Sequence, residues 1–337
     1  MKESIDTLIV NITEICDFAC TFCSAIKISD EHAAMLDINY IYKFLERFPN
    51  TSTIIVLGGD PLMVKPHYYW KLIEHLEQNN YKATISFTTN LWNFYNNPNK
   101  WTDLFNHERI RINTSFNYGN TRRIKPHWVY TEELFWKVSN LFLEKIGYRP
   151  DFISVINDDN KDSAIDNVWL AKEMDVDCKL NPATSSGREK NPFLLANMYE
   201  IYLKIDKLGL SNWEFNTREM KKGITGTTIC PLLRNCDNHI RTINPQGEYY
   251  SCDKFAHDRS EQAKISFDKE INGDFYTPLQ DSYKLNSLKY ECLTCSLFKL
   301  CNGCRKNIQE LKNHNLVETH CSKMKSMQAE IEKLNGQ

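Results

Sequence analysis

The fold of this chain is decided by residues 7–24, which read TLIVNITEICDFACTFCS. The stretch opens with a β-branched run, Thr7 to Ile12, of the kind that forms a buried strand. Three cysteines follow in a loop at the spacing C-x3-C-x2-C, namely Cys16, Cys20 and Cys23. Soft thiolate ligands gathered on one short loop select zinc or iron–sulfur centres. The stretch therefore predicts a metal centre at the carboxyl end of a first strand.

Outward from this stretch, the first 210 or so residues alternate between apolar strands and amphipathic helices. Further strands are expected at residues 53–57, 83–88, 110–116, 152–156 and 176–180. Helices are expected between them at residues 37–48, 66–76, 132–145 and 163–174. Continuous apolar strands between such helices predict a parallel sheet with a covered outer face. Six strand–helix units form either a partial barrel or an open doubly wound sheet, and both gather their chemistry at the carboxyl strand ends.

The composition limits the class of protein. The chain has 337 residues, of which 42% are hydrophobic and 25% charged, and 41 Lys and Arg against 43 Asp and Glu give a net charge of −2. No global basic field favours nucleic acid or a membrane surface. No apolar run approaches the roughly 18 residues that a membrane span needs, and residues 1–6 lack a secretion signal. We therefore expect a cytoplasmic protein with no nucleic acid and no membrane partner.

Twelve cysteines are the unusual number in the composition. In a reducing compartment such thiols stay free or bind metal. Eight of them lie in the 92 residues from Cys230 to Cys321, against four in the other 245. We expect a first domain at residues 1–215, a cysteine-rich domain at 216–325, and the end of a C-terminal helix at 326–337.

The two cysteine groups predict different kinds of site. Three thiolates in the first loop can hold three irons of a [4Fe–4S] cube and leave the fourth iron open for a reactant. The tail reads C-x5-C-x15-C, then C-x2-C-x5-C-x2-C-x16-C. Its eight thiolates are the complement of two fully ligated [4Fe–4S] clusters, and its spacing differs from that of a zinc ribbon. Zinc in the tail, and packed or zinc-bound cysteines in the loop, remain the alternatives.

The first loop, with Phe22 just before its last cysteine, resembles the radical S-adenosylmethionine (SAM) superfamily. The Gly58-Gly59-Asp60-Pro61 stretch after the second strand looks like the GGEP element of that family, with Asp60 in place of Glu. The resemblance implies a partial (β/α)6 TIM-like barrel in which this element binds the SAM amino group. It also implies SAM contacts after the later strands, at Thr89, Asn90, Ser115, Asn117 and Asn157.

The tail resembles the SPASM extension of radical SAM enzymes, including Gly247 shortly before Cys252. By that resemblance two auxiliary clusters are expected. The inner one is assigned to Cys230, Cys236, Cys252 and Cys304, and the outer one to Cys292, Cys295, Cys301 and Cys321. The C-x2-C spacing at residues 301–304 departs from the family, which usually has three residues there. Cys178 is left over as an ordinary core residue.

The resemblance implies an enzyme that cleaves SAM reductively to a 5′-deoxyadenosyl radical and takes a hydrogen atom from a substrate. Most such relatives act on peptides or proteins, so we expect oxidation, crosslinking or epimerisation of a ribosomal peptide or protein. A low-potential donor such as flavodoxin or ferredoxin would supply the electron. In sulfatase-maturing relatives an Asp after the matching cysteine is the base, and this role carries over to Asp253. A dehydrogenase or epimerase of a small molecule, such as an aminocyclitol, and a non-catalytic zinc scaffold are the alternatives.

Overall fold

The computed structural model describes residues 5–24, 34–125, 128–222, 239–250, 252–265, 295–297 and 305–334. Its principal sheet contains β1 (Thr7–Asn11), β2 (Thr53–Leu57), β3 (Thr84–Thr88), β4 (Ile110–Ser115), β7 (Asp151–Ile156), β8 (Cys178–Pro182), β9 (Ile240–Ile243), β10 (Tyr249–Tyr250) and β11 (Lys264–Ile265). Two short strands, β5 (Arg123–Ile124) and β6 (Trp128–Val129), form a separate antiparallel pair.

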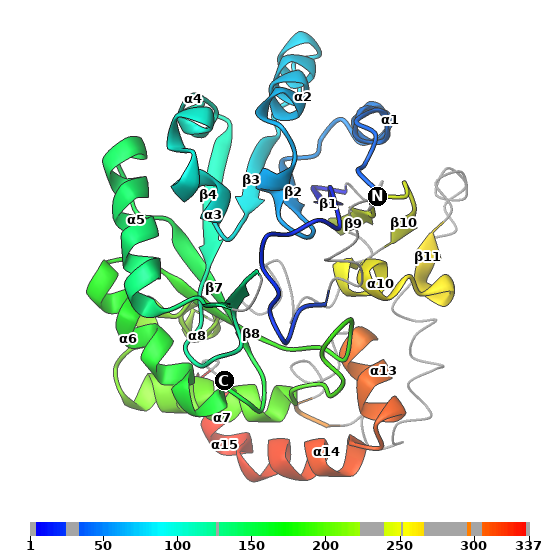
Figure 1. Cartoon of the computed structure of the whole chain (residues 1–337). Coiled ribbons are helices and arrows are strands. Elements are labelled where there is room, and N and C mark those ends of the chain that lie inside the picture. Colours follow the sequence, from blue (N-terminus) through cyan, green and yellow to red (C-terminus); the bar gives the residue numbers. More distant parts are fainter. Residues whose placement is uncertain are drawn as a thin grey trace.

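The order of strands in the sheet decides between the two expected architectures. It runs β11-β10-β9-β1-β2-β3-β4-β7-β8, and every pair from β9 to β8 is parallel. A doubly wound sheet reverses its order at a switch point, whereas β1 to β8 follow one another without reversal. Figure 1 shows the strands arranged along a curve, with helices outside it and the loop after β1 inside it. The fold is thus a partial barrel of the TIM type.

Helices of the first half cover the outer face of this sheet (Figure 1). They are α1 (Asn39–Arg47), α2 (Pro66–Gln78), α3 (Trp92–Asn96), α4 (Thr102–Phe105), α5 (Glu132–Ile146) and α6 (Ala164–Met174). Later helices are α7 (Leu195–Lys207), α8 (Phe215–Lys221), α10 (Asp253–Asp258), α13 (Arg305–Asn313), α14 (Val317–Ser326) and α15 (Gln328–Leu334). No helix in the described ranges is long and apolar enough to span a bilayer.

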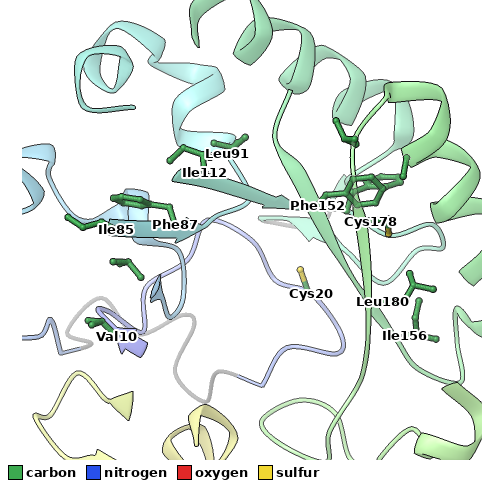
Figure 2. Packing of buried hydrophobic residues seen from close by; sticks show 14 of the residues in the cluster. Val10, Cys20, Ile85, Phe87, Leu91, Ile112, Phe152, Ile156, Cys178 and Leu180 are labelled. Atoms are coloured by element: carbon green, nitrogen blue, oxygen red, sulfur yellow. The ribbon is translucent and has the colours of Figure 1, made fainter. Parts of the chain in front are cut away.

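Alternation along each strand separates a core face from an inner face. On β3, Ile85 and Phe87 are fully buried in the main core, while Ser86 and Thr88 line a cavity inside the barrel. Figure 2 shows the core side chains along several strands, with Cys20 of the loop lying between them in this view. The outer face therefore stabilises the fold, and the inner face is left for chemistry.

Glu214 joins the last barrel strand to α8. Its buried carboxylate accepts hydrogen bonds from the backbone N–H of Leu180 at 3.0 Å and of Thr217 at 2.6 Å. Burial raises the pKa of this carboxyl, although the hydrogen bonds oppose the shift. The chain beyond residue 215 also continues the sheet, because β9 pairs with β1. The expected boundary between two domains near that residue stays a prediction.

Candidate active site

The cysteine loop after β1 is held by backbone hydrogen bonds to the β5–β6 pair. The N–H of Ala19 donates to the carbonyl of Arg123 at 2.7 Å, and that of Lys125 donates to the carbonyl of Asp17 at 2.9 Å. Cys16 and Cys20 are buried, Cys23 is half-buried, and none of the three is in a disulfide. Burial, followed by the nearby carboxylates of Asp60 and Asp17, raises the pKa of the Cys16 thiol in the metal-free chain.

The donor set of this loop fits an iron–sulfur cube. Within the described ranges no three His, Cys, Asp or Glu side chains converge tightly enough to hold one metal ion. Cube ligands have no need to converge on one ion, because each thiolate binds a different iron. Cys16, Cys20 and Cys23 could therefore hold three irons of a [4Fe–4S] cluster.

Gly58 and Gly59 clamp the start of this loop. The N–H of Gly59 donates to the carbonyl of Thr13 at 2.7 Å, and that of Asp60 to the carbonyl of Ile15 at 2.8 Å. A Cβ atom would lie 2.5 Å from the Thr13 oxygen at Gly58 and 2.1 Å from the Ile15 oxygen at Gly59. Glycine is required here by close approach of two backbones. In this structure the approaching backbone is the cysteine loop itself.

Asp60 connects the glycine pair to the end of β3. Its carboxylate accepts the backbone N–H of Leu62 and of Asn90, both at 2.8 Å, and the hydroxyl of Thr89 at 2.9 and 3.0 Å. Burial, reinforced by the nearby Asp17 carboxylate, raises the pKa of Asp60 to about 7. Asn90 donates its Nδ2 hydrogen to Asp17 Oδ1 at 2.7 Å. Asp60, Thr89 and Asn90 thus form one network that ends in the cysteine loop.

Ser115 and Asn117, after β4, are joined by a residue that the sequence analysis missed, Arg122. Its Nη1 donates to Ser115 Oγ at 2.9 Å, and its Nε and Nη2 donate to Asn117 Oδ1 at 3.2 and 3.1 Å. The guanidinium carbon lies 5.2 Å from the centre of the Phe22 ring. Arg122 is 6% exposed. Nothing in its local sequence marked it as buried, since arginines are mostly exposed.

Asn157, after β7, is held from the next loop of the barrel. Its Nδ2 donates to Glu189 Oε2 at 2.9 Å, and its backbone N–H donates to Asn160 Oδ1 at 2.9 Å. Its own Oδ1 is buried without a hydrogen-bond partner among the described residues. Such an orphan acceptor is costly to bury and suits a donor group of a ligand.

Asp253 begins α10, directly after Cys252, and faces the end of β1. Asn11 Nδ2 donates to Asp253 Oδ1 at 2.9 Å, and His257 Nε2 lies 3.4 Å from the same oxygen. Burial would raise the pKa of Asp253, but His257, Lys254 and Asn11 outweigh it and hold the pKa well below its usual range. The carboxylate is therefore fixed and ionised.

A cavity of about 530 Å³ inside the barrel is lined by Phe22 and Cys23 of the cysteine loop together with Cys252 and Asp253 of the C-terminal region. The Asp60 network, the Arg122 cluster and Asn157 lie outside its lining. The rest of the wall comes from the inner faces of the strands, from the loop after β8 and from α13. Residues more than 200 positions apart in the chain thus border one volume. Ligand cavities of this size, mostly apolar with a few polar groups, hold small molecules or side chains.

The remaining tail cysteines are only partly described. Cys295 and Cys321 are half-buried, and neither is in a disulfide. Cys230, Cys236, Cys292, Cys301 and Cys304 lie outside the described residues. The two auxiliary clusters therefore stay a prediction. Cys178 is fully buried at the start of β8, as expected of a core residue.

Comparisons with known proteins agree with this geometry. Residues 10–168 match the family model described as "Radical SAM superfamily". No curated protein matches the sequence. Among solved structures, anSMEcpe with bound AdoMet shares the fold at a TM-score of 0.68 and 15% identity, covering 97% of this chain and 96% of that one.

Two further solved structures contain peptides. Native anSMEcpe with AdoMet and the Cp18Cys peptide gives a TM-score of 0.64 at 16% identity, covering 97% of this chain and 95% of that one. Streptococcus suis SuiB bound to its precursor peptide SuiA gives 0.59 at 16% identity, covering 91% of this chain and 73% of that one. The family match shows a radical SAM domain at residues 10–168, and the cysteine loop and the barrel agree with it.

Proposed function

We propose that this protein is a radical SAM/SPASM oxidoreductase that modifies a ribosomal peptide or a protein. The observation that carries the proposal is the shared cavity, which the cysteine loop borders on one side and Cys252 and Asp253 border on the other. A reacting group placed there lies between a radical source and a fixed carboxylate. The solved structures of anSMEcpe and SuiB with peptides support a peptide as the partner.

The chain's own residues supply binding and orientation. Cys16, Cys20 and Cys23 would hold the cluster, which with SAM supplies a 5′-deoxyadenosyl radical when both are bound. The buried Arg122 guanidinium matches the carboxylate of SAM, since arginine pairs with carboxylates through two parallel hydrogen bonds. Asn157 Oδ1 offers an acceptor to a ligand donor.

Asp253 would act as the base. The polar contacts that described residues make with this carboxylate, from Asn11 and His257, fall on Oδ1. Oδ2 is therefore the oxygen that accepts a proton from the oxidised substrate. The fully ligated auxiliary clusters assigned to the tail cysteines would take up the electron that the substrate radical loses. A flavodoxin or ferredoxin would supply the separate electron that reductive cleavage of SAM consumes.

Anaerobic reconstitution tests the class of function. We expect a brown protein with about twelve irons, four for each of three cubes. Dithionite and SAM should release 5′-deoxyadenosine, and Cys20→Ala should abolish this release. A colourless protein that binds zinc and leaves SAM intact would establish the scaffold alternative instead. Release of 5′-deoxyadenosine with an aminocyclitol, but with no peptide, would favour the small-molecule dehydrogenase or epimerase.

A further inference from the structure

Helix α10 is tied to the beginning of the cysteine loop. We define the cluster loop as residues 12–24. Just before it, Asn11 donates to the first residue of α10, Asp253, at 2.9 Å. Within it, Glu14 forms an ion pair with Arg259, the C-cap residue of the helix. Both ends of α10 therefore contact the chain on the β1 side of the barrel.

The end of the cluster loop is tied to the same helix through the loop after β8. The backbone N–H of Arg188 donates to the Cys23 carbonyl at 2.9 Å, and its Nη1 donates to the Cys20 carbonyl at 3.3 Å. A Cβ at Gly187 would lie 2.5 Å from the Cys23 oxygen. One residue earlier, Ser186 Oγ donates to Asp258 Oδ1 of α10. The turn from Ser186 to Arg188 thus joins the cluster loop to α10.

The buried Lys306 of α13 adds a further contact between α10 and the loop after β8. Its ammonium donates to Asp258 Oδ2 and lies 3.5 Å from Glu310 Oε1. Glu310 in turn accepts the backbone N–H of Ser185 at 2.8 Å and its hydroxyl at 3.2 Å. Lys306 and Glu310 are 5% and 4% exposed. Removing one partner of such a buried ionic group is strongly destabilising, because it leaves an uncompensated charge.

We propose that Lys306 is a positioning residue that fixes α10, and with it Cys252 and Asp253, relative to Cys20 and Cys23. The roles of these four residues rest on the proposed function. The connection between α10 and the cluster loop does not depend on it. Displacement of a reacting group by about 1 Å can cost on the order of a hundredfold in rate. A link built from buried ion pairs suits this requirement better than a surface contact.

Hydrogen exchange in the protein as isolated tests the connection directly. Lys306→Met removes the charge and keeps the stem, and should raise amide exchange at least fivefold in peptides that cover residues 184–188 and 253–259. Lys306→Arg should restore the exchange of the unmodified chain. The matched control is Lys221→Met, which breaks an exposed ion pair with Asp206 at 2.8 Å and should leave both peptides unchanged.

The reconstituted protein supplies a second readout. In Lys306→Met, the electron paramagnetic resonance spectrum of the reduced auxiliary clusters should shift at unchanged iron content. A merely structural role would lower the iron content instead. If Lys306→Met does not fold by circular dichroism, Ser186→Ala takes its place. Unchanged exchange in the variant that folds overturns the inference. An unmodified protein without auxiliary iron would instead overturn the proposed function and leave the exchange result standing.

Discussion

The carboxylate of Asp60 accepts the hydroxyl of Thr89, with oxygen–oxygen distances of 2.9 and 3.0 Å, and so links the turn after β2 to the end of β3. Asp60 stands at the position of the Glu in the GGEP element of the radical SAM family. The backbone N–H of Asn90 donates to the same carboxylate at 2.8 Å. Asn90 in turn reaches Asp17 in the cluster loop. The residue that departs from the family pattern therefore helps to place the cluster loop.

Replacing this carboxylate should loosen the site. In Asp60→Asn one of the two oxygens becomes an amide nitrogen, which then faces a backbone N–H of Leu62 or Asn90. Loss of such a buried acceptor costs about 1–3 kcal/mol of stability. We expect a lower unfolding midpoint and at least tenfold weaker SAM binding in the reconstituted variant, as measured by equilibrium dialysis. Binding and stability equal to those of the unmodified protein would contradict this role.

The glycine pair predicts a steric effect. Gly59→Ala would place a Cβ 2.1 Å from a backbone oxygen, which has no flexible end to move. We expect the variant to retain fewer than half of the irons of the SAM-binding cluster after reconstitution. Gly147→Ala is the matched control, because that glycine has φ +94° but nothing within 4 Å of an added Cβ. It should lose about 1 kcal/mol of stability and no iron.

The buried glutamate behind β8 predicts a pH dependence of stability. Because the pKa of Glu214 is raised in the fold, its contribution is complete below its ordinary pKa, about 4.3, and is lost as pH rises through the folded-state pKa. The Glu214→Gln variant lacks this pH dependence. At low pH its free energy of unfolding should be about 1–3 kcal/mol lower than that of the unmodified protein. Urea unfolding from pH 4 to 8 measures both effects. Glu133→Gln, at an exposed ion pair with Lys137, is the control and should follow the unmodified protein.

Local patterns predicted much of the barrel. The strand expected at residues 53–57 is observed with those bounds, and the helix expected from Pro66 begins there. Buried strands with β-branched residues, and prolines at first helical turns, are local signals that need no partner. The order of the strands in the sheet did not follow from this alternation, because the same strand–helix units build either a partial barrel or a doubly wound sheet.

Long-range pairing is what these patterns could not supply. Strand β9 pairs with β1 from more than 230 residues away, and its four residues carry no distinctive period. The β5–β6 pair, with two residues in each strand, is too short to show alternation. The Arg122 guanidinium reaches the Phe22 ring of the cysteine loop because these two strands lie beside that loop. Contacts of this kind depend on tertiary structure, and the sequence analysis did not find them.

Arg122 provides a test of the proposed SAM contacts after β4. Arg122→Met keeps an unbranched side chain but removes the positive charge beside Ser115 and Asn117. We expect the dissociation constant of SAM to rise at least tenfold, equivalent to about 1.4 kcal/mol. Arg123→Met is the control, since the side chain of Arg123 donates to the Asn120 carbonyl and its backbone contact with the cluster loop is kept. Equal affinities in the two variants would place SAM elsewhere.

Substitution of Asp253 should distinguish radical formation from substrate oxidation, because only the second step needs a base. Asp253→Asn can still meet Asn11 and His257 through its amide, so the position of α10 should be kept, but it lacks a carboxylate oxygen that takes up a proton. We expect 5′-deoxyadenosine release within threefold of the unmodified protein and product formation reduced by at least a hundredfold, with unchanged iron content. Mass spectrometry of a peptide substrate, identified by its reaction with the unmodified protein, measures the product.

Asp258→Asn is the contrasting variant, because the Asp258 carboxylate contacts Ser186 and Lys306 rather than the end of β1. It should change hydrogen exchange in α10 as well as product, whereas Asp253→Asn should change product alone. Full turnover by Asp253→Asn would remove this carboxylate from the mechanism, and a base would then have to be sought among the other groups that line the cavity.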